Sequence, residues 1–318
     1  MGNYIGVWKL DEPIYCRKEV SGKRFCSSIA GIPVVFAFPS LPDTFDGESK
    51  ALSSGDLISP FPPFQNQVNW GMINAWPEGL FTVNALVVAA FCEKEQMPQI
   101  YADFPRWKEK VSNLRMIDSG NYIQSEQKLP AMLTKGNGIY DGVEFFEYIE
   151  GSPLERIKNH RTTEHIRLHF VEREECYSES RVNTLFSNAG STKEIDLPYE
   201  LLIVGYRAFV RLDFRSAVIV AGSGLEMAIE NRIKQEYSNA AEGVYEREAK
   251  KHRMLGGKFR WLSELNISIP VPDYNTAILD VRNDTTHEGL CPTEAQARAY
   301  LEKCKILIEQ YSPNVLVQ

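Results

Sequence analysis

Arginine, asparagine and histidine lie close together in the stretch RNDTTH, where Arg282 and Asn283 come shortly before His287. Arginine keeps its charge at physiological pH, and its paired donors match the oxygens of a phosphate. Histidine gives or accepts a proton near neutral pH, and an asparagine can orient a phosphate or the imidazole ring. These residue types suit metal-independent cleavage of RNA, in which the ribose 2′-hydroxyl attacks the adjacent phosphate.

A single histidine fills only one of the two proton-transfer roles that this reaction needs. A twofold homodimer would supply a second histidine, so the pattern indicates a composite site. On an α-helix, side chains five residues apart point about 140° away from each other, so the two groups face one cleft only if the last turn loosens or a second subunit approaches. The alternative is a helix end at which Arg282 and His287 merely favour the negative pole of the dipole.

A carboxylate and a basic stretch extend the candidate site. Glu226 falls among apolar residues of a helical pattern, where a charged group needs a partner. It could hold Arg282 in place, although pairing with Arg232 or simple exposure would also account for it. The segment Arg247–Arg260 is rich in Lys and Arg and could contact an RNA backbone, or could be solvated helix surface. Its candidate RNA-binding residues are Lys250, Lys251, Arg253 and Lys258.

The elements that must carry these residues are helical. Apolar residues at helical spacing predict a central helix over Asp213–Tyr237 and a second helix over Gly243–Leu265, with a possible break at Gly256 and Gly257. A third helix should begin with Asp273 as its cap and end at Gly289, and a fourth should begin at Thr293, where Gln296 completes a capping box.

The region before these helices mixes strand and helix signals. Strand patterns occur at GIPVVFAF, at VEFFEYI and at EHIRLHFVE, and a short helix is expected from Pro105. The polar stretch Ser187–Pro198 reads as a linker. We therefore expect an α+β domain over residues 1–190 and an all-α domain, a four-helix bundle, over 198–318.

Composition and charge narrow the functional class. The formal net charge is −7 and the acidic excess lies almost entirely before Pro198, which leaves room for a basic face later in the chain. Six cysteines without any CxxC pair favour a reducing, cytoplasmic environment and argue against zinc. We recognise no secretory signal and no membrane-spanning run.

Two other patterns are weak candidates for ligand sites. His165 and His169 could form a metal pair, but no third ligand is evident nearby. The glycine-rich stretch from Gly136 does not have the strand and helix context of a phosphate loop. We therefore expect no metal and no cofactor.

Residues from about Tyr199 to Tyr311 resemble a HEPN domain (higher eukaryotes and prokaryotes nucleotide-binding). The resemblance rests on RNDTTH, on DFRSAVIVAGSGLEMAIENRI as a first long helix, and on the order of LGGKFRWLSELNISIP, the motif helix and PTEAQARAYLEKCKILIEQ. It implies a dimeric four-helix bundle that cleaves RNA without metal, as in toxin, abortive-infection and antiphage systems. Arg282 and His287 would be the catalytic pair, with Asn283 as the supporting polar residue.

Several interpretations stay open at this point. The family also contains modules that bind RNA or nucleotide, or support assembly, without cutting. The amino-terminal domain would sense a trigger, choose the substrate or restrain the nuclease, and an antitoxin partner is possible. We find no nucleophile and base pair that would make that domain an enzyme of its own.

Overall fold

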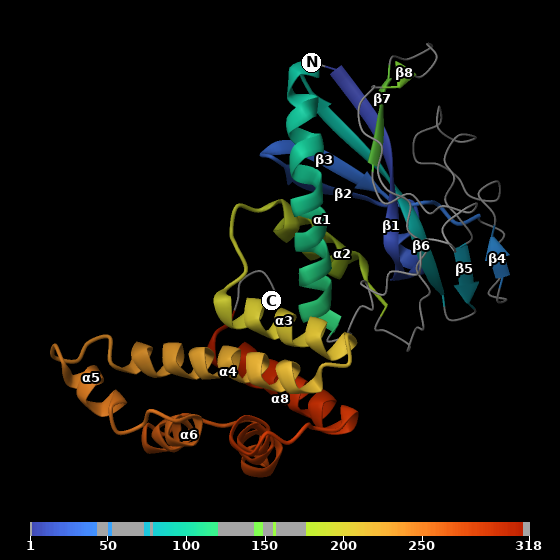
Figure 1. Ribbon diagram of the computed structural model, residues 1–318. Coiled ribbons are helices and arrows are strands. Elements are labelled where there is room, and N and C mark those ends of the chain that lie inside the picture. Colours follow the sequence, from blue (N-terminus) through green and yellow to red (C-terminus); the bar gives the residue numbers. More distant parts are fainter. Residues whose placement is uncertain are drawn as a thin grey trace. The chain divides into compact units, whose positions relative to one another are not determined.

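The computed structural model describes residues 2–42, 50–52, 73–76, 79–119, 143–148, 155–156 and 176–313 (Figure 1). The chain divides into two compact units, Met1–Ser112 with Gln124–Thr192, and Asn113–Ile123 with Lys193–Gln318. The main division falls within the expected linker, whereas Asn113–Ile123 joins the carboxy-terminal unit rather than the first. Within the described ranges, no helix combines the length and the apolar character that crossing a membrane requires.

The amino-terminal unit is built on an antiparallel sheet, as an α+β region should be. Strands run in the order β2-β3-β6-β1-β7-β8, and β4 pairs with β5, which joins β6. The long strands β1 and β6 pair along nearly their whole length, with a register shift between Lys9 and Ile14. The strands are β1 (Gly2–Arg17), β2 (Arg24–Ile29), β3 (Ile32–Ala37), β4 (Lys50–Leu52), β5 (Ile73–Trp76), β6 (Leu80–Cys92), β7 (Val143–Tyr148) and β8 (Glu155–Arg156).

Aromatic side chains join the sheet to two helices, α1 (Met97–Ser119) and α2 (Glu179–Gly190). Phe36 of β3 stacks on Trp107 of α1 at 4.4 Å and on Phe186 of α2 at 4.9 Å between ring centroids. Rings of this size remove much apolar surface from water, so both helices are anchored on this face. The described residues of this unit also contain the short 3₁₀ turns η1 (Lys18–Val20) and η4 (Lys94–Gln96).

Some expectations for this unit need correction. The strands expected at GIPVVFAF and VEFFEYI are confirmed as β3 and β7. Pro105 lies inside α1 instead of starting a helix, and α2 continues to Gly190, so the first part of the expected linker is helical. The stretch EHIRLHFVE with His165 and His169, and the glycine-rich stretch from Gly136, lie outside the described residues.

The carboxy-terminal unit is helical. Asp213 caps the central helix by accepting from the Ser216 amide, and Thr293 and Gln296 form the predicted capping box. The helices are α3 (Leu197–Val210), α4 (Phe214–Glu236), α5 (Val244–Ala249), α6 (Leu255–Glu264), η6 (Asn275–Asp280), α7 (Val281–Asn283), η7 (Asp284–Glu288) and α8 (Glu294–Tyr311).

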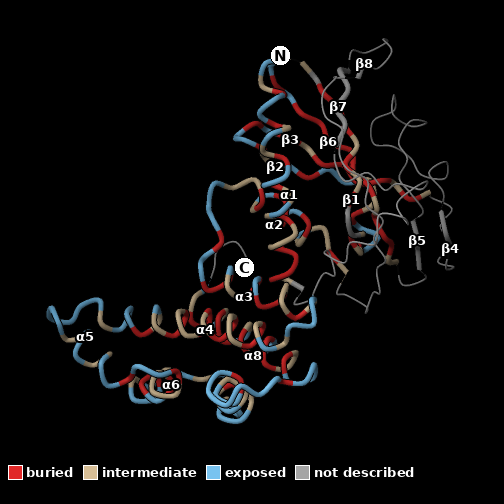
Figure 2. Tube along the Cα trace, viewed as in Figure 1, coloured by how far each residue is buried: buried red, intermediate tan, exposed pale blue. Residues whose placement is uncertain are grey.

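Helix α4 is the centre of this unit and contacts α3, α8, α6 and α7 (Figure 1). Figure 2 shows that much of α4 is buried. A side-chain carbon on Gly224 would lie 2.7 Å from the Pro198 carbonyl, and one on Gly205 of α3 would lie 3.0 Å from Ala221. Small residues, Gly224 among them, therefore let the two helices approach closely.

Three expectations for the helices are wrong in detail. The break in the second helix comes before Leu255, and Gly256 and Gly257 lie in the first turn of α6. Asp273 does not cap the third helix with its side chain, because its carboxylate pairs with Lys303. The third helix itself is mostly π-helical, in η6 and η7.

Candidate functional site

The motif Arg282–His287 lies on a helix with unusual winding. Arg282 belongs to the short α-helical piece α7, and His287 belongs to the π-helical turn η7. Inside this turn Thr285 is buried, and its hydroxyl donates to the Val281 carbonyl at 2.6 Å. A hydroxyl bonded to the carbonyl four residues earlier bends a helix, so it helps to keep the turn wide. Gly289 then ends the segment with a positive φ of 70°.

The wide winding changes how the two motif side chains are oriented. A π-helical turn closes i→i+5 hydrogen bonds, so each turn holds more residues than the roughly 3.6 of an α-helix. The backbone from Asp284 to Glu288 is π-helical. Because the segment is α-helical through Asn283 and π-helical after it, the angle between the Arg282 and His287 side chains should be smaller than the roughly 140° of a regular α-helix. The backbone of this segment is therefore not a regular α-helix throughout, and the convergence of Arg282 and His287 on one cleft stays a prediction.

Arg282 is fixed by the central helix. Its Nη2 donates to Glu226 Oε2 at 2.9 Å, and the two side chains are 17% and 24% exposed. Of the readings that the sequence left open for Glu226, the structure has the pairing with Arg282, since Arg232 pairs with Glu236 instead. Gly222 makes room for it, because a side-chain carbon there would lie 3.1 Å from Arg282 Nε and 2.5 Å from the Tyr300 hydroxyl.

The same carboxylate binds a second cation. Lys258 Nζ lies 3.2 Å from Glu226 Oε1 and 2.9 Å from Glu230 Oε2, and Glu230 also pairs with Lys234 at 3.0 Å. The hydrogen bond from Lys258 is the main reason why the pKa of Glu230 falls to about 2. We call these five residues the Glu226 cluster: Glu226, Glu230, Lys234, Lys258 and Arg282.

Buried neighbours close the inner side of the Glu226 cluster. Tyr300 is fully buried, and its hydroxyl has no hydrogen-bond partner by distance and angle among the described residues. Burial raises the pKa of Tyr300 well above its ordinary value, and burial likewise raises the pKa of Cys304. Both groups stay neutral at physiological pH, so they form a low-dielectric wall beside the Arg282 guanidinium.

His287 and Asn283 are open to solvent. In the part of the chain that the structure describes, neither side chain has a hydrogen bond or an ion pair. Their contacts, if they serve a reaction, must come from a ligand or from another molecule. The structure thus joins Arg282 to Glu226 and leaves His287 and Asn283 exposed on the same helical segment.

The basic residues of the stretch Arg247–Arg260 differ in their exposure and in their ion pairs. Lys250 and Arg253 are exposed and have no ion pair with any described residue, while Lys251 pairs with Glu248 at 2.7 Å. Lys258 is only 12% exposed because it belongs to the Glu226 cluster. Of the four candidate RNA-binding cations, Lys250 and Arg253 are therefore the two that are exposed and not paired with a carboxylate of the described residues.

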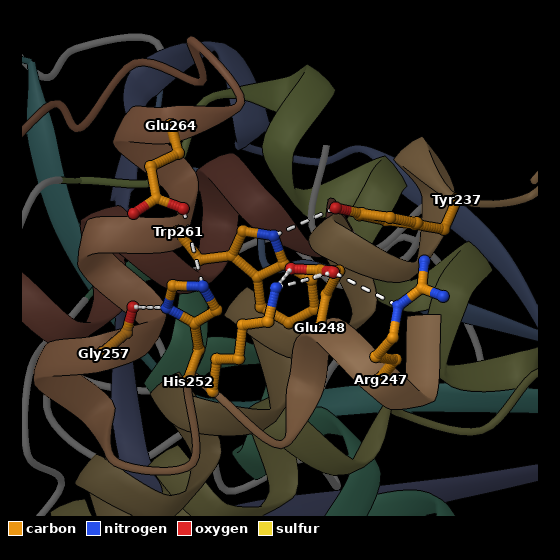
Figure 3. Close-up of polar contacts among 8 residues, drawn as sticks. Tyr237, Arg247, Glu248, His252, Gly257, Trp261 and Glu264 are labelled. Carbon is orange, nitrogen blue, oxygen red and sulfur yellow. Dashed lines mark hydrogen bonds and ion pairs between the residues drawn. The ribbon is translucent and has the colours of Figure 1, made fainter. Parts of the chain in front are cut away.

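A second polar group, the Trp261 cluster, gathers around α6 and consists of Tyr237, His252, Trp261 and Glu264 (Figure 3). His252 is buried and stacks on Trp261 with ring centroids 5.0 Å apart. Its Nδ1 lies 3.1 Å from the Gly257 carbonyl oxygen and its Nε2 lies 3.5 Å from a Glu264 oxygen. Trp261 in turn donates to the Tyr237 hydroxyl at 3.2 Å.

No metal cluster is found in the described ranges, where no three His, Cys, Asp or Glu side chains gather closely enough to hold an ion. Comparison with models of known families, with curated proteins and with solved structures gives no significant match to this chain.

Sequence reasoning missed two parts of this site. It placed Lys258 among the candidate RNA-binding residues of the basic stretch, although the side chain pairs with Glu226 and Glu230. Its position three residues after Leu255 and one before Phe259, both buried, is the signal that places it at the edge of the apolar face. Lys234 was not considered, although Glu230 precedes it at i,i+4 spacing.

Proposed function

We propose that the carboxy-terminal helical unit is a HEPN-type endoribonuclease that acts without a metal ion. One observation carries the proposal: Arg282 is held by Glu226 on a partly π-helical segment, and the exposed His287 follows about one wide turn later. π-Helical turns are rare and occur frequently at functional sites. In support, the three segments on which the resemblance to a HEPN domain rests form the helices α4, α6, η6–η7 and α8 in that chain order.

In the proposed reaction the 2′-oxygen of a ribose forms a bond to the adjacent phosphorus, and the bond from phosphorus to the 5′-oxygen breaks. One histidine takes the proton of the 2′-hydroxyl, and a second gives a proton to the departing 5′-oxygen. Arg282 stabilises the charge that builds up on the phosphate oxygens. His287 of each protomer would supply one of the two proton-transfer groups in a homodimer.

The amino-terminal unit would then regulate this activity. A cytoplasmic effector of toxin or antiphage type needs a means of staying silent until a trigger arrives, and a large separate unit is suited to that role. Exposed Lys250 and Arg253 would add sequence-independent affinity for the RNA backbone.

The decisive experiment compares His287→Ala with Thr286→Ala, which changes an exposed neighbour in the same π-helical turn. Purified protein is incubated with mixed RNA in EDTA, and product ends are analysed. We expect fragments ending in 2′,3′-cyclic phosphate from the wild type and from Thr286→Ala, and a loss of at least about 100-fold in His287→Ala. Equal cleavage by His287→Ala would reject the site.

A second candidate is a HEPN module that binds RNA or nucleotide, or supports assembly, without cutting. It is favoured by the lack of any group among the described residues that orients the His287 ring, because a catalytic base is commonly held by a third group. This candidate predicts RNA that co-elutes with the protein and stays intact. Toxicity on expression that disappears with His287→Ala would instead indicate a nuclease awaiting its trigger.

A further inference from the structure

Lys258 occupies a position that a surface RNA contact would not need. Its side chain is 12% exposed, and its ammonium group lies between two carboxylates, 3.2 Å from Glu226 and 2.9 Å from Glu230. A flexible lysine normally keeps its charge in water and loses rotamer freedom when it is fixed. The two ion pairs therefore hold Lys258 where it faces the inside of the cluster.

Glu226 is shared by two cations, one on each oxygen. Arg282 binds Oε2 at 2.9 Å, and Lys258 binds Oε1 at 3.2 Å. A poorly solvated carboxylate that loses its only cation is strongly destabilised. If Arg282 were the only cation beside Glu226, a turn of its guanidinium toward a phosphate would leave this carboxylate unpaired. Because Lys258 stays in place, Glu226 keeps one positive partner while Arg282 is engaged elsewhere.

We infer that Lys258 is a positioning residue that keeps Glu226 compensated and so frees Arg282 to bind a phosphate of the RNA. This inference rests on the proposed function, and it assigns to Lys258 a role through Arg282 instead of direct contact with the substrate. Glu230 holds Lys258 from the other side, and Lys234 balances Glu230 at 3.0 Å. The cluster thus has three cationic side chains against two carboxylates, which leaves an excess of positive charge for an anionic ligand.

The test measures affinity for a fluorescent oligoribonucleotide whose 2′-positions are methylated, so that it cannot be cleaved. Lys258→Met should weaken binding about tenfold, because Glu226 then retains Arg282. Lys258→Arg should stay within about threefold of the wild type, because it restores the cation. In a Glu226→Gln background the carboxylate that holds Arg282 is absent, so Lys258→Met should change affinity by less than about twofold.

The exposed Lys250 supplies the matched control. Whatever effect Lys250→Met has on binding should be the same in the wild-type and in the Glu226→Gln background, because Lys250 makes no ion pair with any described residue. Thermal melting of every variant checks the fold, and Lys258→Gln replaces Lys258→Met if the latter does not fold.

Each outcome separates the two proposals. An equal loss with Lys258→Met in both backgrounds would mean that Lys258 contacts RNA directly, and no loss in either would leave it a purely structural role. Both results overturn the inference and leave the nuclease proposal standing. A wild-type protein that neither binds the methylated RNA nor cleaves the natural form would reject the proposed function, and the inference with it.

Discussion

The Glu226 cluster and the Trp261 cluster are both partly buried polar groups of the helical unit, but they are built differently. The Glu226 cluster joins α4, α6 and α7 by ion pairs, and two of its cations share one carboxylate. The Trp261 cluster joins α6 to the chain just before it and to the end of α4 through stacked rings and hydrogen bonds (Figure 3). In the Glu226 cluster, a ligand could replace one partner of an ion pair. The Trp261 cluster contains no lysine or arginine that could bind an anionic ligand.

Under the proposed function, the Glu226 cluster serves a ligand and the Trp261 cluster serves the fold. An ion pair gains little over a well-packed apolar contact once desolvation is counted, so stability alone does not explain five charges in one place. An aromatic stack with satisfied hydrogen bonds is a sufficient reason for the Trp261 cluster. Mutations should therefore affect the two clusters in different ways.

Removing the shared carboxylate should have the largest effect. Glu226→Ala leaves Arg282 and Lys258 poorly solvated and facing each other, and we expect a loss of about 2–3 kcal/mol in the free energy of unfolding. Urea denaturation measures it. The matched change in the Trp261 cluster is Glu264→Ala, where the side chain is 54% exposed, and its effect should stay within about 0.5 kcal/mol. Similar losses for the two variants would contradict the comparison.

Filling the space beside Arg282 should come next. A methyl group at Gly222 would lie 2.5 Å from the Tyr300 hydroxyl and 3.1 Å from Arg282 Nε, so Gly222→Ala should destabilise the unit by about 1–3 kcal/mol. Gly256→Ala in α6 is the control, because its nearest neighbour would be Leu279 at 3.5 Å. There the gain in helix propensity should stabilise by up to about 1 kcal/mol. Urea denaturation that shows Gly222→Ala to be neutral would mean that Tyr300 and Arg282 move aside easily.

The parts of the fold that follow from nearby residues were predictable. Asp213 and the pair Thr293 with Gln296 are caps that can be read locally, and both are present. The strands β3 and β7 likewise follow from β-branched and aromatic runs bounded by turn residues. These signals lie within a few positions of the element that they define.

The π-helical winding and the Glu226 cluster were less predictable for a physical reason. A stripe at Ala277, Ile278 and Val281 fits α- and π-helical turns almost equally well, and the hydroxyl bond of Thr285 is visible only in three dimensions. Lys258 lies on α6, whereas its partner Glu230 lies on α4, 28 positions earlier in the chain. Contacts of this kind depend on how helices cross, which one-dimensional periodicity does not determine.

Changing the buried imidazole of the Trp261 cluster should cost less than the first two changes. His252→Leu keeps an apolar side chain beside Trp261 but leaves the Gly257 carbonyl without its bond from Nδ1, so we expect a loss of about 1–1.5 kcal/mol. Lys251→Met, at the exposed neighbouring position, should change the unfolding free energy by less than about 0.5 kcal/mol in the same urea denaturation. Equal values would mean that the imidazole bond contributes nothing to the fold.

The smallest effect concerns acid stability of the Glu226 cluster. The pKa of Glu230 is lowered to about 2 in the folded chain from its ordinary value of 4.5, chiefly by the hydrogen bond from Lys258. A lowered pKa means that the unfolded chain binds the proton more readily, so the stabilisation is complete above pH 4.5 and is lost as the pH falls toward 2. The Glu230 side chain is 35% exposed, so solvent screening should reduce the contribution to about 1 kcal/mol or less.

Unfolding curves recorded from about pH 5 to about pH 2 should therefore fall less steeply for Glu230→Gln than for the wild type. Glu294→Gln is the control, because its ion pair with Arg298 lies at the surface, where the Glu294 side chain is 59% exposed, and its curve should follow the wild type. Lys258→Met should flatten the curve as Glu230→Gln does, since Lys258 is the main cause of the low pKa. A Glu230→Gln curve as steep as the wild-type curve would mean that the ion pair between Lys258 and Glu230 is too weak in solution to anchor Lys258 beside Glu226.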